Sequence, residues 1–514
     1  MEGQPMDRPN ILILYTDQQR WDAVGCNGNA EIKTPNLDKM ARGGLNFDRF
    51  FVQNPVCMPS RVSFLSGQYP SQLKITHMGV PVPENLPTLP HLLRNYGYTS
   101  ANIGKLHFLP HACRDHREVH PAYGFDHLEI SDEPGCYEDA YRAWVRRKAP
   151  GELHFLPHAC RDHREVHPAY GFDHLEISDE PGCYEDAYRA WVRRKAPGEL
   201  DKISCGLPPA TAIWQKALGF RDGIKHPEVR EPRTAAFPSR SDLTHTAFVA
   251  EQTIEFIRRC RAGPFLCIAG FYSPHSPWVA PQEFLDLYDP TRLSVPKFPD
   301  DVNAKRGERF SDAALQRIKQ GYYAMITEVD HHVGRILACL DEEGLADDTI
   351  VLFTSDHGEY LGEFLRFGKG FPGEDCISRV PLLLRWPKGI TRPGETIRHI
   401  VEAVDVVPTL LDWAGIPIPA YIQGVPLPAS NDDARTKASA LLESTQGKSL
   451  RMDRCRYIVR ENGREELYDL TRELGEYSNV ASDPSYAAAL SEARGEMVRR
   501  LVQVERPMPR IWPY

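Results

Sequence analysis

The chain has 514 residues, of which 41% are apolar and 25% charged, and these fractions are typical of a large globular protein. Its net charge of −9 is modest for the length and does not favour nucleic acid or an anionic membrane as a partner. No apolar run approaches the roughly 18 residues needed to span a bilayer. A local group of cations, rather than the field of the whole protein, must therefore attract any anionic substrate.

The N-terminal segment predicts a cytoplasmic protein. Residues 1–10 are polar and lead directly into the apolar run 11–14, which is soon ended by Asp17. That run is too short for the core of a signal peptide. The twelve cysteines show no spacing typical of a disulfide framework, so we expect reduced and mostly buried thiols.

Short apolar strands alternate with amphipathic helices along the first 430 residues. Because the strands are apolar throughout, they are typical of a parallel sheet covered on both faces. The sequence therefore predicts an α/β fold, with a large mixed, mostly parallel sheet sandwiched by helices. In chain order the expected elements are a strand at 11–16, a strand at 98–103, a helix at 247–257, a strand at 264–272, a helix at 315–340, a strand at 349–354 and a helix at 406–414.

The composition changes after the last of these helices. Residues 416–428 are rich in proline, and the later segments are short, with strand-like pieces at 457–459 and 466–468. We predict a catalytic domain at residues 1–430 and a smaller α+β subdomain at 431–514, with a small antiparallel sheet and a tail. The tail, residues 506–514, combines proline with aromatic residues, which favours docking on a neighbouring subunit in a homodimer or homotetramer.

An exact tandem repeat is the most unusual feature of the sequence. Residues 107–153 recur without a difference as residues 154–200. Solenoid repeats usually occur as three or more diverged copies, so we interpret the second copy as a recent duplication or a sequence error, with one copy surplus and looped out. Only the first copy is preceded by Lys105, and we therefore place the functional histidine at His107 rather than His154. A metal cluster within the repeat is a weaker alternative, since the spacing matches no zinc pattern: His111, Cys113, His116 and His120.

Polar residues follow two of the predicted strands. Asp17 and Gln18 come directly after the first strand, and Asp356 and His357 follow the strand at 349–354. In open α/β sheets ligands bind outside the carboxyl ends of the strands, and oxygen ligands with an imidazole suit Ca²⁺, Mg²⁺ or Mn²⁺. The alternative is that the two aspartates only cap following helices.

Cys57 precedes a predicted helix. Pro59 suits the first turn of a helix, which would place Cys57 at the N-terminus, where backbone N–H groups favour an anion. The alternative is a buried structural cysteine.

Two further basic residues have neighbours that restrict or free the backbone. Lys369 lies between two glycines and His275 is flanked closely by two prolines. Lys105 and His107 point the same way if the strand before them continues.

Several segments together resemble the type I sulfatases of the alkaline phosphatase superfamily. Residues 57–61 (CMPSR) look like the family's C-x-P-S-R signature, whose cysteine a converting enzyme oxidises to formylglycine. Residues 104–107 (GKLH) are similar to its G-K-x-H element, and residues 355–359 (SDHGE) to its metal-binding S-D-[HN]-G-E. Further family-like segments lie at 34–38, 97–98, 405–409 and 467–470, so the resemblance extends over nearly the whole chain.

The resemblance implies a site and its cofactors. One divalent metal ion, Ca²⁺ or Mn²⁺ with Mg²⁺ as a further candidate, would be held by Asp17, Gln18, Asp356 and His357, with the modified Cys57 completing the set. Arg61 would orient the formylglycine, His107 would hold one of its hydroxyls, and Lys105, Lys369 and His275 would bind the sulfate and steady the leaving group. The family usually opens with two acidic residues, so Gln18 is a departure that lowers the negative charge at the metal by one.

The implied reaction is hydrolysis of aryl or alkyl sulfate monoesters through a formylglycine hydrate and a covalent sulfo-enzyme intermediate. The partners would be a small sulfate ester and, during maturation, a formylglycine-generating enzyme. A phosphonate monoester or phosphodiester hydrolase on the same scaffold is the first alternative, which Ser60, Lys105 and His107 disfavour. A non-catalytic metal-binding protein with unmodified Cys57 is the second.

Overall fold

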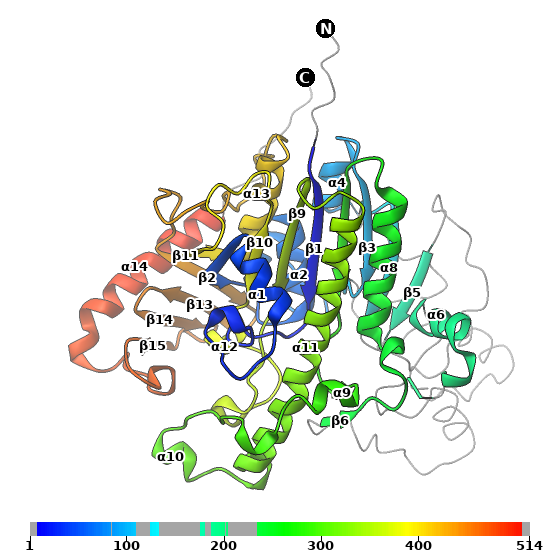
Figure 1. The fold of residues 1–514 in the computed structure, drawn as a ribbon. Coiled ribbons are helices and arrows are strands. Elements are labelled where there is room, and N and C mark those ends of the chain that lie inside the picture. The colour runs from blue at the N-terminus through cyan, green and yellow to red at the C-terminus, as the bar shows by residue number, and fades with distance from the viewer. Residues whose placement is uncertain are drawn as a thin grey trace, which may run out of the picture.

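The protein is described by a computed structural model that covers residues 8–83, 85–108, 124–132, 175–179, 187–200, 202–203 and 234–505. A nine-stranded sheet forms its centre, in the order β11-β2-β10-β9-β1-β7-β3-β4-β5 (Figure 1). Only β10 among these strands runs antiparallel to its neighbours. The predicted mixed, mostly parallel α/β sheet is confirmed. The strand bounds are β1 Asn10–Thr16, β2 Leu45–Phe51, β3 Thr99–Gly104, β4 His127–Asp132, β5 Leu175–Asp179, β7 Phe265–Gly270, β9 Thr349–Ser355, β10 Leu382–Arg385 and β11 Glu395–Glu402.

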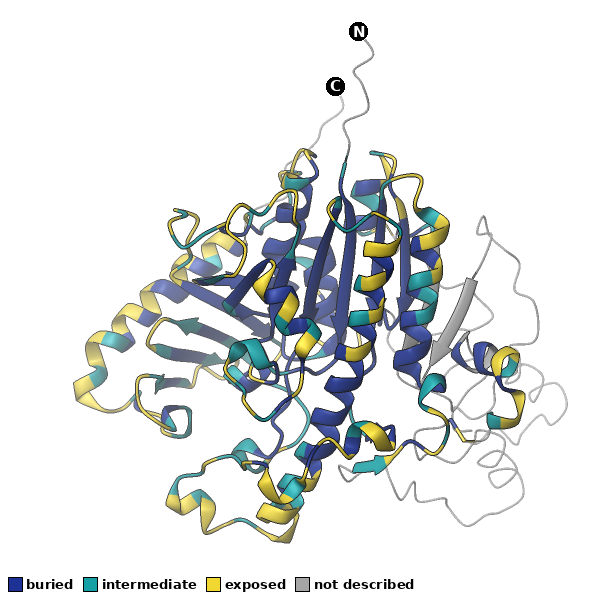
Figure 2. Cartoon of the chain, in the orientation of Figure 1, coloured by how far each residue is buried: buried dark blue, intermediate teal, exposed yellow. Residues whose placement is uncertain are grey.

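The first strand shows why the sheet is covered on both faces. Every residue of β1 is buried, and successive side chains of a strand point to opposite faces. Ile11 and Ile13 join one apolar core with helices α2 (Cys57–Ser66), α4 (Leu89–Arg94) and α13 (Val406–Trp413). Leu12 and Leu14 join a second core with α1 (Pro35–Arg42), α8 (His245–Cys260) and α11 (Asp312–Glu342). In Figure 2 the central strands around β1 are accordingly dark blue, whereas α8 and α11 are exposed along their outer sides.

A separate four-stranded antiparallel sheet follows the central sheet in the chain. It contains β12 (Ser439–Ser444), β13 (Gly447–Met452), β14 (Cys455–Arg460) and β15 (Glu465–Asp469), and α14 (Ala487–Val504) packs on it. The guanidinium of Arg500 on α14 donates to both carboxylate oxygens of Glu402 at the end of β11, at 2.9 and 2.8 Å. This buried ion pair attaches the helix to the central sheet. The boundary at residue 430 stays a prediction, and the tail at 506–514 lies outside the described residues.

Both copies of the repeat contribute to the structure. β4 belongs to the first copy and β5 to the second, and the two identical segments pair in parallel, with Leu128 opposite Leu175. Helix α6 (Ala187–Lys195) also comes from the second copy, and its Tyr188 is buried against α8 and donates to the carbonyl of Leu243. The expectation that one copy is looped out was therefore wrong. The second strand adds to the open edge left by the first, because an edge strand carries unpaired backbone groups. The histidine and cysteine cluster of the repeat, and His154, lie outside the described residues.

Candidate active site

Adjacent parallel strands bring the predicted polar residues together. β1 and β9 pair in parallel with Thr16 opposite Ser355, so Asp17 and Asp356 both lie one residue beyond the same edge of the sheet. Neither aspartate caps a helix: a short 3₁₀ helix begins at Gly25 after the first and another at Glu363 after the second. The capping alternative is therefore wrong.

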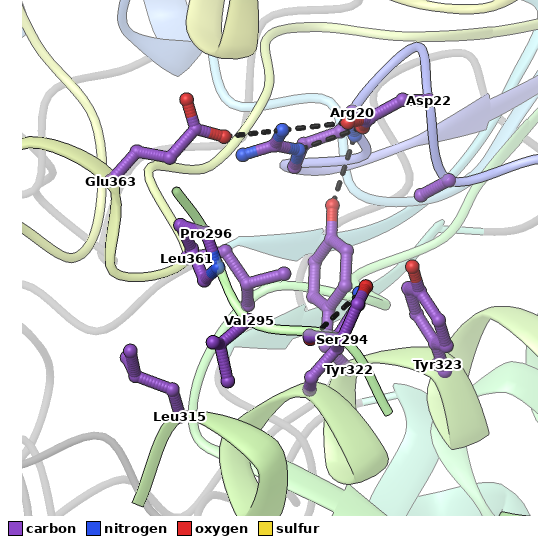
Figure 3. Close-up of a pocket in the computed structure, with 12 residues that line it drawn as sticks. Arg20, Asp22, Ser294, Val295, Pro296, Leu315, Tyr322, Tyr323, Leu361 and Glu363 are labelled. Atoms are coloured by element: carbon purple, nitrogen blue, oxygen red, sulfur yellow. Dashed lines mark hydrogen bonds and ion pairs between the residues drawn. The ribbon is translucent and has the colours of Figure 1, made fainter. Parts of the chain in front are cut away.

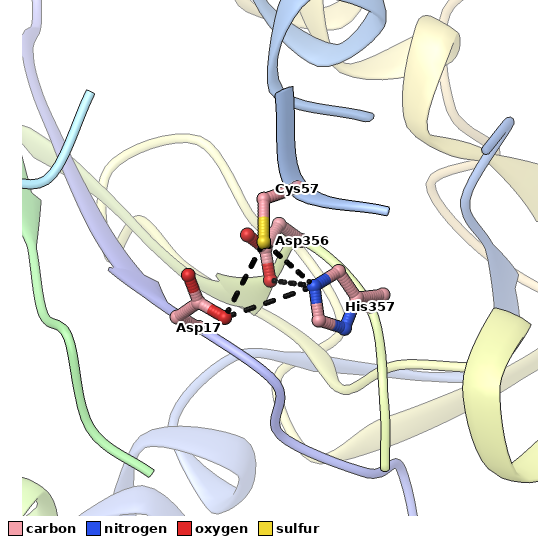
Figure 4. Close-up of side chains that lie close together, drawn as sticks. All are labelled: Asp17, Cys57, Asp356 and His357. Carbon is pink, nitrogen blue, oxygen red and sulfur yellow. Dashed lines mark hydrogen bonds and ion pairs between the residues drawn. The ribbon is translucent and has the colours of Figure 1, made fainter. Parts of the chain in front are cut away.

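Four buried side chains at this edge are arranged as a cation site. One ligand atom from each of Asp17, Cys57, Asp356 and His357 can be chosen so that all four lie within 4.8 Å of one another, and the side chains converge from three segments (Figure 4). His357 Nδ1 lies 2.9 Å from the carbonyl oxygen of Gly358. Since a carbonyl only accepts, Nδ1 carries the proton and Nε2 keeps its lone pair for a ligand. The set of two carboxylates and one neutral imidazole fits a divalent cation.

Neighbouring charges and burial hold two of these groups in ligand form. Burial by itself raises the pKa of Asp17, but Lys105, Lys369, His275 and Arg61 outweigh it and keep that pKa well below its ordinary value. Burial lowers the pKa of His357 to about 4, so its imidazole is neutral at pH 7. Metal ligands must be deprotonated to bind. Both groups meet that condition before any metal arrives.

Cys57 occupies the N-terminus of α2, as predicted. The helix begins at Cys57, with Val56 in extended conformation before it and Pro59 in its first turn. The sulfur lies 3.1 Å from His357 Nε2 and 3.8 Å from Asp17 Oδ1. Burial, with Asp17 nearby, raises the pKa of the thiol far above its ordinary value. Cys57 is thus buried, as a purely structural cysteine would be, but it also lies within the polar cluster.

Arg61 links three parts of the site one turn along the same helix. Its Nε donates to Asp356 Oδ2 at 2.8 Å, its Nη1 to the carbonyl of Lys105 at 2.9 Å, and its Nη2 lies 3.5 Å from Asp17 Oδ2. The guanidinium also lies over the ring of Tyr15, 4.7 Å from its centre. A planar guanidinium can satisfy several acceptors at once. Arg61 therefore fixes both aspartates relative to α2.

Lys105 lies inside the site, although not by the geometry that strand alternation predicts. β3 ends at Gly104, whose φ is +92°, and His107 also has a positive φ of 57°. The strand does not continue, so alternation cannot decide where Lys105 and His107 point. Lys105 Nζ lies 2.6 Å from Asp17 Oδ2 and is fully buried. His107 is buried as well, and its role stays a prediction.

Lys369 and His275 form the outer part of the site. Lys369 Nζ lies 2.6 Å from Cys57 Sγ and 3.2 Å from His275 Nε2. His275 Nδ1 lies 2.7 Å from the carbonyl of Ser276, so Nδ1 carries a proton and Nε2 accepts from the lysine. Both glycines beside Lys369 have positive φ, 81° and 142°. Lys369 and His275 are only half-buried, whereas the cation cluster is fully enclosed.

Gln18 lies beside the cluster, in the left-handed region with a φ of 70°. Its backbone N–H donates to Asp356 Oδ1 at 3.1 Å. Its side-chain Nε2 donates to Glu359, a residue of the 355–359 motif to which the sequence assigned no role. The structure therefore adds a buried carboxylate next to the position where the family usually has a second acid.

Three aromatic residues also escaped sequence reasoning. Tyr15 lies under Arg61, and the ring of Tyr272 lies 5.2 Å from Lys105 Nζ; both follow the pattern of aromatic faces that attract cations. Tyr322 of α11 donates to the carbonyl of Gln18 at 2.7 Å and accepts from the N–H of Arg20 at 2.9 Å. It lines a neighbouring cavity of about 180 Å³, where its hydroxyl points toward Arg20 (Figure 3). Tyr15 and Tyr272 stand close to strand ends in the sequence, but Tyr322 reads as an ordinary helix-core residue.

Comparisons with known proteins agree with this geometry. The family model described as Sulfatase matches residues 9–416. The chain is 28% identical to an arylsulfatase of Clostridium perfringens, covering 96% of this chain and 94% of that protein. It is 26% identical to the multifunctional alkaline phosphatase superfamily protein PehA of Trinickia caryophylli, over 98% and 97% of the two chains.

Solved structures share the fold. The phosphonate monoester hydrolase of Agrobacterium radiobacter superposes with a TM-score of 0.72 at 24% identity, covering 97% of this chain and 96% of that one.

No helix in the described part of the chain is long and apolar enough to cross a membrane. The match of the family model over most of the chain shows that this protein belongs to the sulfatase family of sulfuric ester hydrolases.

Proposed function

We propose that this sulfatase hydrolyses aryl or alkyl sulfate monoesters with a nucleophile made from Cys57 by oxidation to formylglycine, assisted by Ca²⁺, Mn²⁺ or Mg²⁺. One observation carries the proposal: Cys57 Sγ lies between the other members of the cation cluster, 3.1 Å from His357 Nε2, and the ammonium of Lys369, 2.6 Å away. A group at this position can reach a cation on one side and an anionic substrate on the other.

The unmodified thiol lacks part of the chemistry that the proposed reaction needs. Burial raises the pKa of the Cys57 thiol in the metal-free protein, only the thiolate is an effective nucleophile, and a single sulfur has no second group whose deprotonation could release sulfate. A formylglycine hydrate would instead supply two hydroxyls, one to attack sulfur and one whose deprotonation releases sulfate. The motif at 57–61 supports recognition by a formylglycine-generating enzyme during maturation.

The polar cluster assigns binding roles to the chain's own residues. Asp17, Asp356 and His357 would hold the cation, with Gln18 as a further ligand. A divalent cation bound there supplies positive charge to the nucleophile and to the sulfate oxygens. Arg61 keeps the two aspartates in place through hydrogen bonds at 2.8 and 3.5 Å.

Lys369 is placed to act on the substrate. It would hydrogen-bond a sulfate oxygen and stabilise charge that develops in the transition state. His275 Nε2 accepts from Lys369, so the lysine is the better placed of the two to give a proton to the departing alcohol oxygen. Because these two side chains are the half-buried ones, the alcohol part of the ester would lie on their side. His107 would accept the proton of the second hydroxyl.

Substrate preference separates this proposal from its first alternative. The relatives matched over nearly their whole length include an arylsulfatase, whereas the similarity to a phosphonate monoester hydrolase supports the alternative at the level of the fold. We expect kcat/KM to be higher on a nitrophenyl sulfate than on a matched phosphonate monoester. The reverse order would favour the alternative.

The state of residue 57 tests the enzyme against a non-catalytic metal-binding protein. Protein purified from its native host should show, by mass spectrometry of the peptide that carries Cys57, the mass of formylglycine. A peptide that contains only unmodified cysteine would support the non-catalytic alternative.

We further propose that the enzyme is cytoplasmic and assembles as a homodimer or homotetramer. Cell fractionation can check the location, and analytical sedimentation can check the oligomeric state.

A further inference from the structure

Glu359 is a fully buried carboxylate in contact with two parts of the active site. One oxygen, Oε1, accepts from the backbone N–H groups of Leu361, at 3.1 Å, and of Gly368. The other oxygen, Oε2, accepts from the side-chain amide of Gln18. Gly368 immediately precedes Lys369. A single carboxylate therefore connects the residue beside the cation cluster with the loop that carries the sulfate-binding lysine.

The number and type of these contacts require a carboxylate. All three partners are N–H donors, and an ionised carboxylate only accepts. A glutamine at position 359 would offer one accepting oxygen, so its NH₂ would face either the two backbone donors or the donor end of Gln18. The first arrangement leaves buried backbone donors unpaired, which is unfavourable, and the second turns the oxygen of Gln18 toward position 359 and away from the cation site.

The contact also decides which end of Gln18 is available. A side-chain amide has a donor end and an acceptor end, and only the carbonyl oxygen can bind a metal. Because Nε2 is held by Glu359, Oε1 is the end left to serve as a ligand. We propose that Glu359 is a positioning residue that fixes the amide of Gln18 for metal binding, an inference that rests on the cation site of the proposed function.

In this chain the amide of Gln18 is a favourable partner for the carboxylate of Glu359. An acid there would place two carboxylates against each other in a buried site, which is unfavourable. Glutamine at 18 with glutamate at 359 keeps a negative charge close to the cation while the two side chains attract each other. Gln18 and Glu359 therefore form a hydrogen-bonded pair in which Glu359 carries the negative charge.

Metal affinity tests this role without depending on catalysis. The full-length protein with unmodified Cys57 would be freed of metal and titrated calorimetrically with Mn²⁺, and then with Ca²⁺. Partners that orient metal ligands contribute about 10- to 100-fold in affinity, so Glu359→Gln should weaken binding at least about tenfold. Glu359→Asp keeps the charge but shortens the reach to Gln18, and it should also weaken binding. The matched control is Glu328→Gln, which removes a buried carboxyl bonded to Thr244, and it should bind as the wild type does.

The reciprocal exchange distinguishes positioning from a general structural effect. In Gln18→Glu combined with Glu359→Gln, the amide at 359 can donate to the carboxylate at 18, so metal affinity should recover to within about threefold of wild type. Wild-type affinity in Glu359→Asp would show that charge alone suffices and would overturn the proposal, as would a double variant no better than Glu359→Gln. A wild-type protein that binds neither ion would instead overturn the cation site itself, and the positioning role with it.

Discussion

The ammonium of Lys369 lies 2.6 Å from the sulfur of Cys57, although the two residues are 312 positions apart in the sequence. The same ammonium lies 3.2 Å from His275 Nε2. Position 57 is thus bounded by a cation site on its buried side and by a positively charged side chain on its accessible side. That arrangement suits a nucleophile that must approach a sulfate whose oxygens carry negative charge.

Replacing Cys57 by serine should separate the two halves of the reaction. Serine supplies one hydroxyl, which can attack sulfur, but it lacks the second hydroxyl needed to release sulfate. A rapid-mixing assay with a nitrophenyl sulfate should give a burst of about one alcohol per enzyme followed by no turnover, as expected for a trapped covalent intermediate. Continued multiple turnover by Cys57→Ser would contradict the role of the hydrate.

Removing Lys369 should impair catalysis much more than metal binding. Loss of one donor to developing transition-state charge typically lowers kcat by about 10²–10³, and we expect a loss in this range for Lys369→Ala. Initial rates on a nitrophenyl sulfate measure it, with Mn²⁺ affinity measured in parallel. Lys297→Ala, which removes an exposed lysine paired with Glu473, is the control and should leave both quantities unchanged.

Glu328 should make the protein less stable as pH rises. Burial raises the pKa of this carboxyl from 4.5 to about 8, so between these pH values the folded state keeps a proton that the unfolded state releases. The free energy of unfolding therefore falls across this window, by an amount on the order of a few kcal/mol. Urea unfolding from pH 4.5 to 8 should show the wild type losing stability relative to Glu328→Gln as the pH rises. A difference that does not change with pH would contradict the raised pKa.

Deleting residues 154–200 should preserve folding and activity. The deletion removes β5, an edge strand, and α6, but residues 140–148 repeat the sequence of α6 without change. The first copy can therefore supply the buried counterparts of Tyr188 and Trp191 against α8. Thermal unfolding and kcat/KM of the shortened protein check this, and loss of either would show that the extra strand is structurally required.

The sequence by itself indicated much of this site, for a definable reason. Asp17 ends an apolar strand and Asp356 ends another, and the carboxyl ends of parallel strands meet at one edge of a sheet. The start of α2 at Cys57 was predictable because Pro59 suits a first turn. These inferences depend on short-range patterns, which a linear chain displays directly.

Tertiary structure alone decided the contacts between segments. The pairing of Gln18 with Glu359, the hydrogen bonds of Tyr322 and the position of Lys369 between Cys57 and His275 join residues 94 to 341 positions apart. β10 runs antiparallel between β2 and β9. Both repeat copies enter the sheet because the edge of β4 can pair with a further strand. Local composition shows which residues can donate or accept, but only the folded chain determines which donor meets which acceptor.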